Sequence, residues 1–307
     1  MEKRSEVAVR FEAFARDLQT RICNGLAAVD GSGPFRADSW ERPGGGGGIS
    51  RVLADGAVFE KAGVNFSSVY GQLRPDLAAS MPGDGLDFFA CGVSLVLHPK
   101  SPMIPTTHAN FRCLERGQTM WFGGGADLTP YYPVREDAEH FHRTLKGACD
   151  RHDPTYYRRW KRWCDEYFYL PHRKETRGIG GIFFDYLKDD RERDFAFVRD
   201  AADSFLPSYL PIVERRRGDT WGEAERQFQL LRRGRYVEFN LIFDRGTTFG
   251  LKTDGRTESI LMSLPPLCRW EYDAQFPAGS REAGLIDWLR PTDWLGLGPD
   301  PDAKEPI

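Results

Sequence analysis

The 307-residue chain contains few cysteines and no long apolar run. Its six cysteines are scattered without a CxxC pair, which argues against a zinc ribbon or a disulfide framework and fits reduced thiols. No apolar run approaches the roughly 20 residues that a membrane-spanning helix needs, and the charged first residues, MEKRSEVAVR, lack the apolar core of a signal peptide. We therefore expect a cytoplasmic protein without a transmembrane segment.

The chain also lacks a strong excess of charge and any nucleotide-binding fingerprint. A formal net charge of -3 and a pI near 6.1 argue against a dominant nucleic-acid surface. The glycine-rich segment 121–132, WFGGGADLTPYY, has neither the Walker nor the GxGxxG spacing, so its glycines favour a close backbone approach. These absences predict no nucleic-acid partner and no organic cofactor such as a flavin or a nicotinamide.

The hydrophobic pattern predicts a single-domain α+β fold with a mainly antiparallel sheet, because strands joined by short turns alternate with separate blocks of helices. Helices are expected within residues 1–30 and over 136–149, 154–170, 195–205 and 223–233. Strands are expected over 57–71, 87–98, 106–112, 177–185 and 258–264. The alternation over 236–243, with the turn Asp244–Gly246, predicts a hairpin that continues to Leu251.

Two segments are expected to be irregular. The five consecutive glycines at 44–48 predict a mobile linker, and the alternative is a lid that closes over a ligand. The tail at 299–307 is expected to fray.

The most informative segment is 92–112, GVSLVLHPKSPMIPTTHANFR, in which two strand-like runs flank a proline-containing connection. Side chains alternate along a strand, so Ser94 and His98 share one face of the first run. In the second run His108, Asn110 and Arg112 share a face by the same rule. Burying such groups is costly unless a ligand, water or ion satisfies them. The pattern therefore predicts a lined pocket.

The six histidines decide whether a metal site is plausible. His140 and His142 are two apart on a predicted helix and point in different directions, and His142 shares a face with apolar residues. His142 can thus join His98, His108 and His172 in an inward cluster, although the spacing matches no short motif such as HExxH. A metal site and a set of proton-transfer or anion-binding imidazoles both remain open.

Charged residues at the ends of predicted strands are the remaining candidates. Asp185 closes an apolar run, where it can accept a hydrogen bond from an N–H group of a ligand or begin a turn. Asp127 is interpreted as a cap or a structural partner. Several arginines also lie beside strand ends or turns, where they can bind a polyanionic substrate or form surface ion pairs: Arg112, Arg235, Arg245 and Arg256.

Ten ordered blocks resemble the oxygen-dependent coproporphyrinogen III oxidase family across nearly the whole chain. They are WERPGGGGG, FEKAGVNFSSVYG, GVSLVLHP, PTTHANFR, WFGGGADLTPYY, HFHRTLKGACD, KRWCDEYFYLPHR, RGIGGIFFD, RRGRYVEFNLIFDRGTTFGL and ESILMSLPP. The resemblance implies a large, mainly antiparallel sheet flanked by helices on both sides. It also implies an enzyme that uses molecular oxygen to convert the ring A and B propionates of coproporphyrinogen III to vinyl groups, giving protoporphyrinogen IX in haem biosynthesis.

The resemblance also implies roles for particular residues. His108 resembles the family's proton donor, and Asp185 resembles the acid that meets the pyrrole N–H groups. Substrate contacts are implied for Ser94, Asn110, Phe111, Arg112, Asp254, Gly255 and Arg256. A divalent metal is implied at His98, His108, His142 and His172. The family forms homodimers, and the implied interface includes roughly Tyr236 to Glu271.

Two positions depart from the family pattern. Tyr186 stands where the family has a second acid after Asp185. The common Gly-Gly-Arg before the ESILMS block reads Asp254-Gly255-Arg256, and the added carboxylate would repel an anionic substrate unless it points away.

Overall fold

The computed structural model describes residues 4–79, 81–252 and 255–298, and in these a seven-stranded antiparallel sheet carries the fold. The strand order is β1-β2-β3-β4-β5-β6-β9, so β1 and β9 form the edges. The strands are β1 (Arg36–Glu41), β2 (Gly46–Ala54), β3 (Phe59–Gln72), β4 (Asp87–Pro99), β5 (Thr106–Arg116), β6 (Thr119–Thr129) and β9 (Gly181–Leu187). A short second sheet pairs β7 (Tyr169–Leu170) with β8 (Glu175–Thr176).

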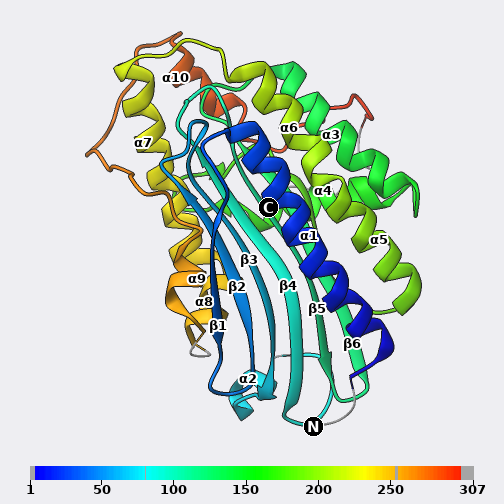
Figure 1. The fold of residues 1–307 in the computed structure, drawn as a ribbon. Coiled ribbons are helices and arrows are strands. Elements are labelled where there is room, and N and C mark those ends of the chain that lie inside the picture. Colours follow the sequence, from blue (N-terminus) through cyan, green and yellow to red (C-terminus); the bar gives the residue numbers. More distant parts are fainter. Residues whose placement is uncertain (1–3, 80, 253–254, 299–307) are drawn as a thin grey trace.

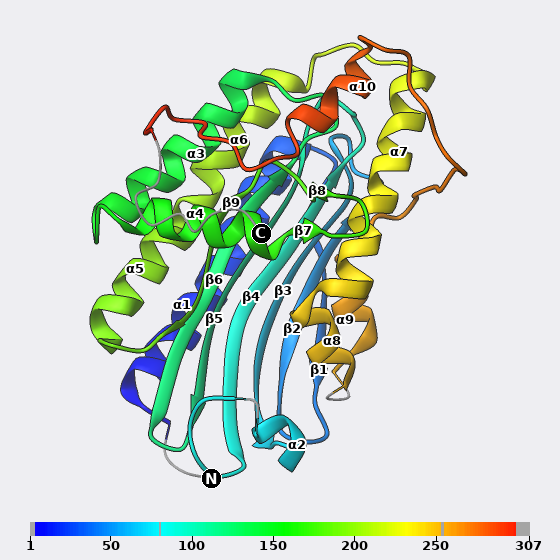
Figure 2. The ribbon, with the colours of Figure 1, turned by 180° about the vertical axis from the view of Figure 1, so that it is seen from behind.

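Helices cover both faces of the large sheet, as expected (Figures 1 and 2). On one face lie α1 (Glu6–Asp30), α3 (Arg135–Asp150), α5 (Arg191–Asp203) and α6 (Phe205–Arg216). The other face and the ends of the sheet carry α2 (Pro75–Ala78), α4 (Tyr156–Tyr167), α7 (Glu223–Glu238), the π-helix η1 (Phe239–Phe243), α8 (Arg245–Lys252), α9 (Thr257–Leu261), α10 (Arg281–Gly284) and the 3-10 turn η2 (Leu285–Asp287). None of the described helices is long and apolar enough to cross a membrane.

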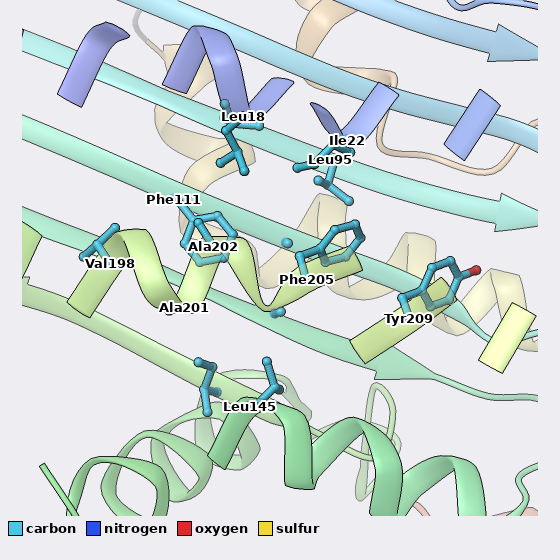
Figure 3. Packing of buried hydrophobic residues seen from close by; sticks show 14 of the residues in the cluster. Leu18, Ile22, Leu95, Phe111, Leu145, Val198, Ala201, Ala202, Phe205 and Tyr209 are labelled. Carbon is cyan, nitrogen blue, oxygen red and sulfur yellow. The ribbon is translucent and has the colours of Figure 1, made fainter. Parts of the chain in front are cut away.

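The main core lies between the sheet and the α1 layer, and strand alternation builds it. In β4 and β5 the inward set is Val93, Leu95, Leu97, Ala109, Phe111 and Cys113, each at most 1% exposed. Leu18 and Ile22 of α1 cover these strands beside residues of α5 and α6 (Figure 3). The opposite side chains of the same strands therefore point to the other face, which is free to hold a site.

Local signals fix both ends of α1. The Ser5 hydroxyl accepts a hydrogen bond from the backbone N–H of Ala8 at 3.2 Å, and Gly31 ends the helix at φ 75°. The buried carboxylate of Asp30 accepts backbone N–H groups of Ala57, Val58 and Phe59. Burial alone would raise the pKa of Asp30, but these bonds and one from Ser32 lower it below its usual value. Asp30 thus attaches α1 to the start of β3.

The hairpin predicted over 236–251 is wrong. α7 continues through Gly234 to Glu238, and the chain then passes through η1 into α8. The strand predicted over 258–264 is also wrong, because α9 occupies its first part. Short apolar runs fit a strand and a helix equally well, and here packing decides: Phe239 and Asn240 are buried, whereas Leu241 and Ile242 face outward.

The linker expected from the five glycines is also wrong. Residues 46–48 begin β2 and pair with β3, and residues 47 and 48 also pair with β1. A Cβ at Gly47 would lie 2.3 Å from the backbone oxygen of Trp40, and one at Gly48 would lie 2.3 Å from that of Phe66. The glycines therefore permit close strand pairing. None of them lines the cavity described below, so the lid alternative has no support from their position.

Candidate active site

A cavity of about 450 Å³ lies on the sheet face opposite α1. Its floor comes from β3, β4, β5, β6 and β9, and its cover comes from the end of α4, η1, α8 and α9. Six residues predicted from the sequence line it: Ser94, His108, Asn110, Arg112, Asp185 and Arg245. The volume falls within the range of small-molecule sites, about 300–1,000 Å³. The period-two pattern of β4 and β5 therefore predicted the cavity-facing side chains except His98, which is buried and does not line the cavity.

Arg112 and Asp185 form an ion pair on the cavity floor. A terminal nitrogen of Arg112 lies 2.8 Å from Oδ2 of Asp185, and the other donates to Oδ1 of Asn110 at 2.8 Å. Gly123 lies beside this pair, and a Cβ there would be 2.5 Å from Asp185 Oδ1 and 2.7 Å from Arg112 Nη2. The first glycine of the GGG run thus makes room for the ion pair.

A second charged group joins three elements. Nδ1 of His108 on β5 lies 2.8 Å from Oδ1 of Asp127 on β6. Arg177, just before β9, donates to both oxygens of Asp127 at 2.8 Å and to Oδ1 of Asn240 in η1 at 2.8 Å. Because Nδ1 of His108 is used by the carboxylate, Nε2 is the nitrogen left for the cavity. The π-helix delivers Asn240 to this group, as such turns often do at functional sites.

The Asp127–Arg177 pair is buried, and both side chains are 2% exposed. Burial alone would raise the pKa of Asp127, but the charge of Arg177 and the bond from His108 lower it. Burial likewise would lower the pKa of Arg177, and Asp127 raises it instead. The guanidinium carbon lies 4.1 Å from the ring centroid of Phe168 and 4.5 Å from that of Tyr236. Both groups therefore stay charged and hold His108 in one orientation.

The cover of the cavity carries a further cation. Arg245, at the start of α8, lies 4.9 Å from the ring centroid of Tyr167, and both line the cavity. Among the residues that the structure describes, Arg245 forms no ion pair with an acid. The neighbouring carboxylate of Asp244 is used by the hydroxyl of Tyr167 and by Thr247. A cation in this position suits an anionic ligand.

One comparison with known proteins decides the family. The sequence model of the family described as coproporphyrinogen III oxidase matches residues 10–294. The chain belongs to this family. Membership supports coproporphyrinogen III oxidase activity, an oxidoreductase step of haem biosynthesis, and implies coproporphyrinogen III as the substrate. Its four propionates make this substrate a polyanion, which fits a cavity that Arg112 and Arg245 line.

The four histidines proposed for a metal in the oxidase family do not come together in this chain. Nε2 of His98 lies 2.9 Å from the backbone oxygen of Ser263, and Nε2 of His172 lies 2.7 Å from Glu238. The buried His142 bonds to Ile179 O and Tyr157, while His108 lines the cavity. In the described part of the chain no group of three or more His, Cys, Asp or Glu residues is arranged to hold a metal ion. These residues therefore do not fit a shared metal.

Three other predicted substrate contacts of this oxidase lie away from the cavity. Phe111 is 1% exposed and packs into the core, because it alternates with Asn110 and Arg112. Gly255 and Arg256 do not line the cavity, and Arg256 instead forms an ion pair with Asp38 at 2.6 Å. Asp254 lies outside the described residues, as does the tail at 299–307.

Sequence reasoning missed part of the oxidase site. Arg177 was not singled out, and Asp127 was interpreted as a structural residue although it holds His108. The available signal was the position of Arg177 in an apolar, glycine-rich run, because a charged side chain buried in such a run needs a partner of opposite charge. Trp121 and Tyr186 also line the cavity without having been proposed as site residues. A pocket-facing Trp121 follows from alternation once β6 is placed beside β5.

Proposed function

We propose that the chain is an oxygen-dependent oxidase that converts the ring A and ring B propionates of coproporphyrinogen III to vinyl groups. The observation that carries this proposal is the paired arrangement on one sheet face, Arg112–Asp185 beside His108–Asp127–Arg177. The Arg112–Asp185 pair offers a cation for a carboxylate and an acceptor for a pyrrole N–H. The His108–Asp127–Arg177 group offers an imidazole that is fixed in place for proton transfer.

The redox balance requires a two-electron acceptor. Each propionate loses its carboxylate as carbon dioxide and one hydrogen from the carbon next to the pyrrole, which leaves a vinyl group and releases two electrons. Molecular oxygen takes up these two electrons and two protons and becomes hydrogen peroxide. We propose that no organic cofactor takes part, since the sequence has no flavin or nicotinamide fingerprint.

The cavity gives each residue a place in this reaction. Asp185 accepts hydrogen bonds from Arg112 and from the backbone N–H of Tyr186 at 3.0 Å. A carboxylate has about four acceptor positions, so Asp185 keeps room for a pyrrole N–H that it orients or helps to deprotonate. Arg112 and Arg245 bind propionates, with Ser94 and Asn110 as neutral donors and acceptors. His108 passes a proton from Nε2 to reduced oxygen, because Asp127 holds Nδ1.

We further propose that the oxidase works as a homodimer in the cytoplasm. Several large apolar side chains of the described segment 236–271 are exposed: Leu241, Ile242, Phe243, Leu251, Leu267 and Trp270. The chain at Arg269 and Trp270 lies against α7, since the N–H of Arg269 donates to the backbone oxygen of Leu230 and Trp270 Nε1 donates to Glu238. Exposed apolar groups gathered on adjacent segments favour a protein interface.

The first experiment measures turnover of coproporphyrinogen III by chelator-treated protein in air and under nitrogen. Product chromatography and oxygen uptake are followed together. We expect one oxygen consumed per vinyl group in air, and no product under nitrogen. Product that forms only after a divalent metal is restored would overturn the metal-free version, and binding without turnover in either case would make the protein a tetrapyrrole carrier.

A matched pair of variants tests the assignment of Asp185. Asp185→Asn removes the charge at the cavity floor and is expected to lower kcat by about 100-fold or more. Asp200→Asn removes a carboxylate that pairs with Arg151 and His152 outside the cavity, and it should retain wild-type kcat. Turnover by Asp185→Asn at the wild-type rate would remove Asp185 from the mechanism.

A further inference from the structure

The edge strand β9 carries an extra residue at the cavity. The β6–β9 register pairs Phe122 with Leu187 and Gly124 with Phe184. Asp185 and Tyr186 together therefore oppose the single residue Gly123, which is the arrangement of a β-bulge. Tyr186 has φ 56°, a left-handed conformation that residues with a Cβ rarely adopt.

The bulge changes where two neighbouring side chains point. In a regular strand Asp185 and Tyr186 would face opposite sides of the sheet. Both line the cavity instead, and the left-handed turn also lets the backbone N–H of Tyr186 donate to Oδ1 of Asp185 at 3.0 Å. Bulges beside active sites commonly redirect a side chain in this way.

The ring of Tyr186 extends an aromatic surface into the cavity. It stacks on Trp121 with a centroid distance of 6.4 Å and an interplanar angle of 26°. Trp121 is 3% exposed, whereas Tyr186 is 42% exposed. A bulky residue held at positive φ is strained. Because the Tyr186 ring is exposed, its burial within the chain contributes little free energy to offset that strain. Binding a ligand would bury the ring further.

We propose that Tyr186, supported from behind by Trp121, forms an aromatic wall that packs against one pyrrole ring of the bound tetrapyrrole, next to Asp185 and Arg112. This inference rests on the proposed function and names a further binding residue of the same cavity, Tyr186, together with the ring that supports it. An electron-rich pyrrole and an aromatic side chain pack well in offset or edge contacts. A tyrosine in place of the second acid at this position also adds no negative charge beside the propionates.

The test separates the ring from the backbone. Tyr186→Gly removes the ring and relieves the positive φ, so the variant is expected to melt at the same or a higher temperature than wild type. Its KM for coproporphyrinogen III should nevertheless rise about three- to tenfold, the value of one aromatic contact, while kcat stays within about twofold because the backbone N–H still holds Asp185. Tyr186→Phe, which restores the ring, should recover most of the lost affinity.

Two further variants and one direct binding measurement make the result decisive. Asp55→Gly relieves a second positive φ, 56°, outside the cavity and should leave KM unchanged. Tyr186→Asn also lacks the ring and tolerates the left-handed conformation, so it replaces the glycine variant if that one fails to fold. Binding of coproporphyrin III, followed by quenching of tryptophan fluorescence, should weaken as KM rises.

The outcomes separate the two proposals. A wild-type KM in a folded variant without the ring would overturn the proposed aromatic wall. Inactive wild-type protein would instead refute the proposed function.

Discussion

The buried Asp127–Arg177 pair gives the sharpest test of how the site is built. Arg177→Met keeps an apolar chain among Phe168 and Tyr236 but removes the guanidinium. The carboxylate of Asp127 would stay buried but lose its two 2.8 Å hydrogen bonds from Arg177. Only the bond to His108 would remain. Removing one partner of a buried ion pair costs about 3–5 kcal/mol, and we expect a loss of free energy of unfolding in this range at neutral pH.

The difference in stability between the wild type and Arg177→Met should also depend on pH. In the wild type the pKa of Asp127 is lowered, so its ionisation contributes stability above the unfolded pKa of about 3.9 and this contribution is lost as pH falls through the folded pKa. Without Arg177, burial raises the pKa of Asp127, and the variant loses stability as pH rises above about 3.9. The difference between the two proteins should therefore be larger at pH 7.5 than at pH 4.5.

Urea unfolding at both pH values, followed by fluorescence and circular dichroism, measures this difference. The double variant Arg177→Met with Asp127→Asn removes the orphaned charge and should recover about 2 kcal/mol of the loss. It also keeps an acceptor for His108. A loss below about 1 kcal/mol at both pH values, or a double variant no more stable than the single one, would refute the view that the pair is a coupled buried unit.

Three other predictions address separate parts of the molecule. Gly123→Ala places a Cβ against Asp185 and Arg112, and steady-state kinetics should show kcat/KM lowered on the order of 100-fold while the protein stays folded. Asp30→Ala removes the acceptor of three backbone N–H groups and should cost roughly 3 kcal/mol in urea unfolding at pH 7. Because the pKa of Asp30 is lowered, that difference should shrink as pH falls through the folded pKa. Ile242→Asp puts a charge on the exposed apolar segment, and sedimentation should show a monomer if that segment forms the homodimer interface.

The sequence predicted those parts of the fold in which a strand or helix packs one of its faces against the core. Strand β4 and strand β5 alternate cleanly because the core covers one side and the cavity lies on the other, so Ser94, His108, Asn110 and Arg112 were placed correctly. The alternation over 236–243 predicted a hairpin, and 258–264 was predicted as a further strand, but the structure has the end of α7, η1, α8 and α9 there. Short apolar runs fit a strand and a helix equally well.

The parts of the site that escaped prediction depend on partners far apart in the chain. Asp127 and Arg177 are 50 residues apart, and no local pattern shows that they meet. The four histidines predicted to share a metal lie apart in the structure. Strand alternation and helix periodicity predict which face a side chain lies on, but not how far it lies from side chains of other elements. The bulge at Tyr186 likewise exists only relative to its pairing with β6.

The position of that bulge on an edge strand has an evolutionary consequence. A one-residue insertion in a central strand such as β4 would exchange its core and cavity faces, and two neighbouring ladders would have to shift with it. In the described sheet β9 pairs with β6 alone, so its extra residue disturbs a single ladder. The extra residue on β9 therefore leaves the register of the other strands unchanged. This edge is a place where selection can adjust how the pocket fits its substrate at little risk to folding.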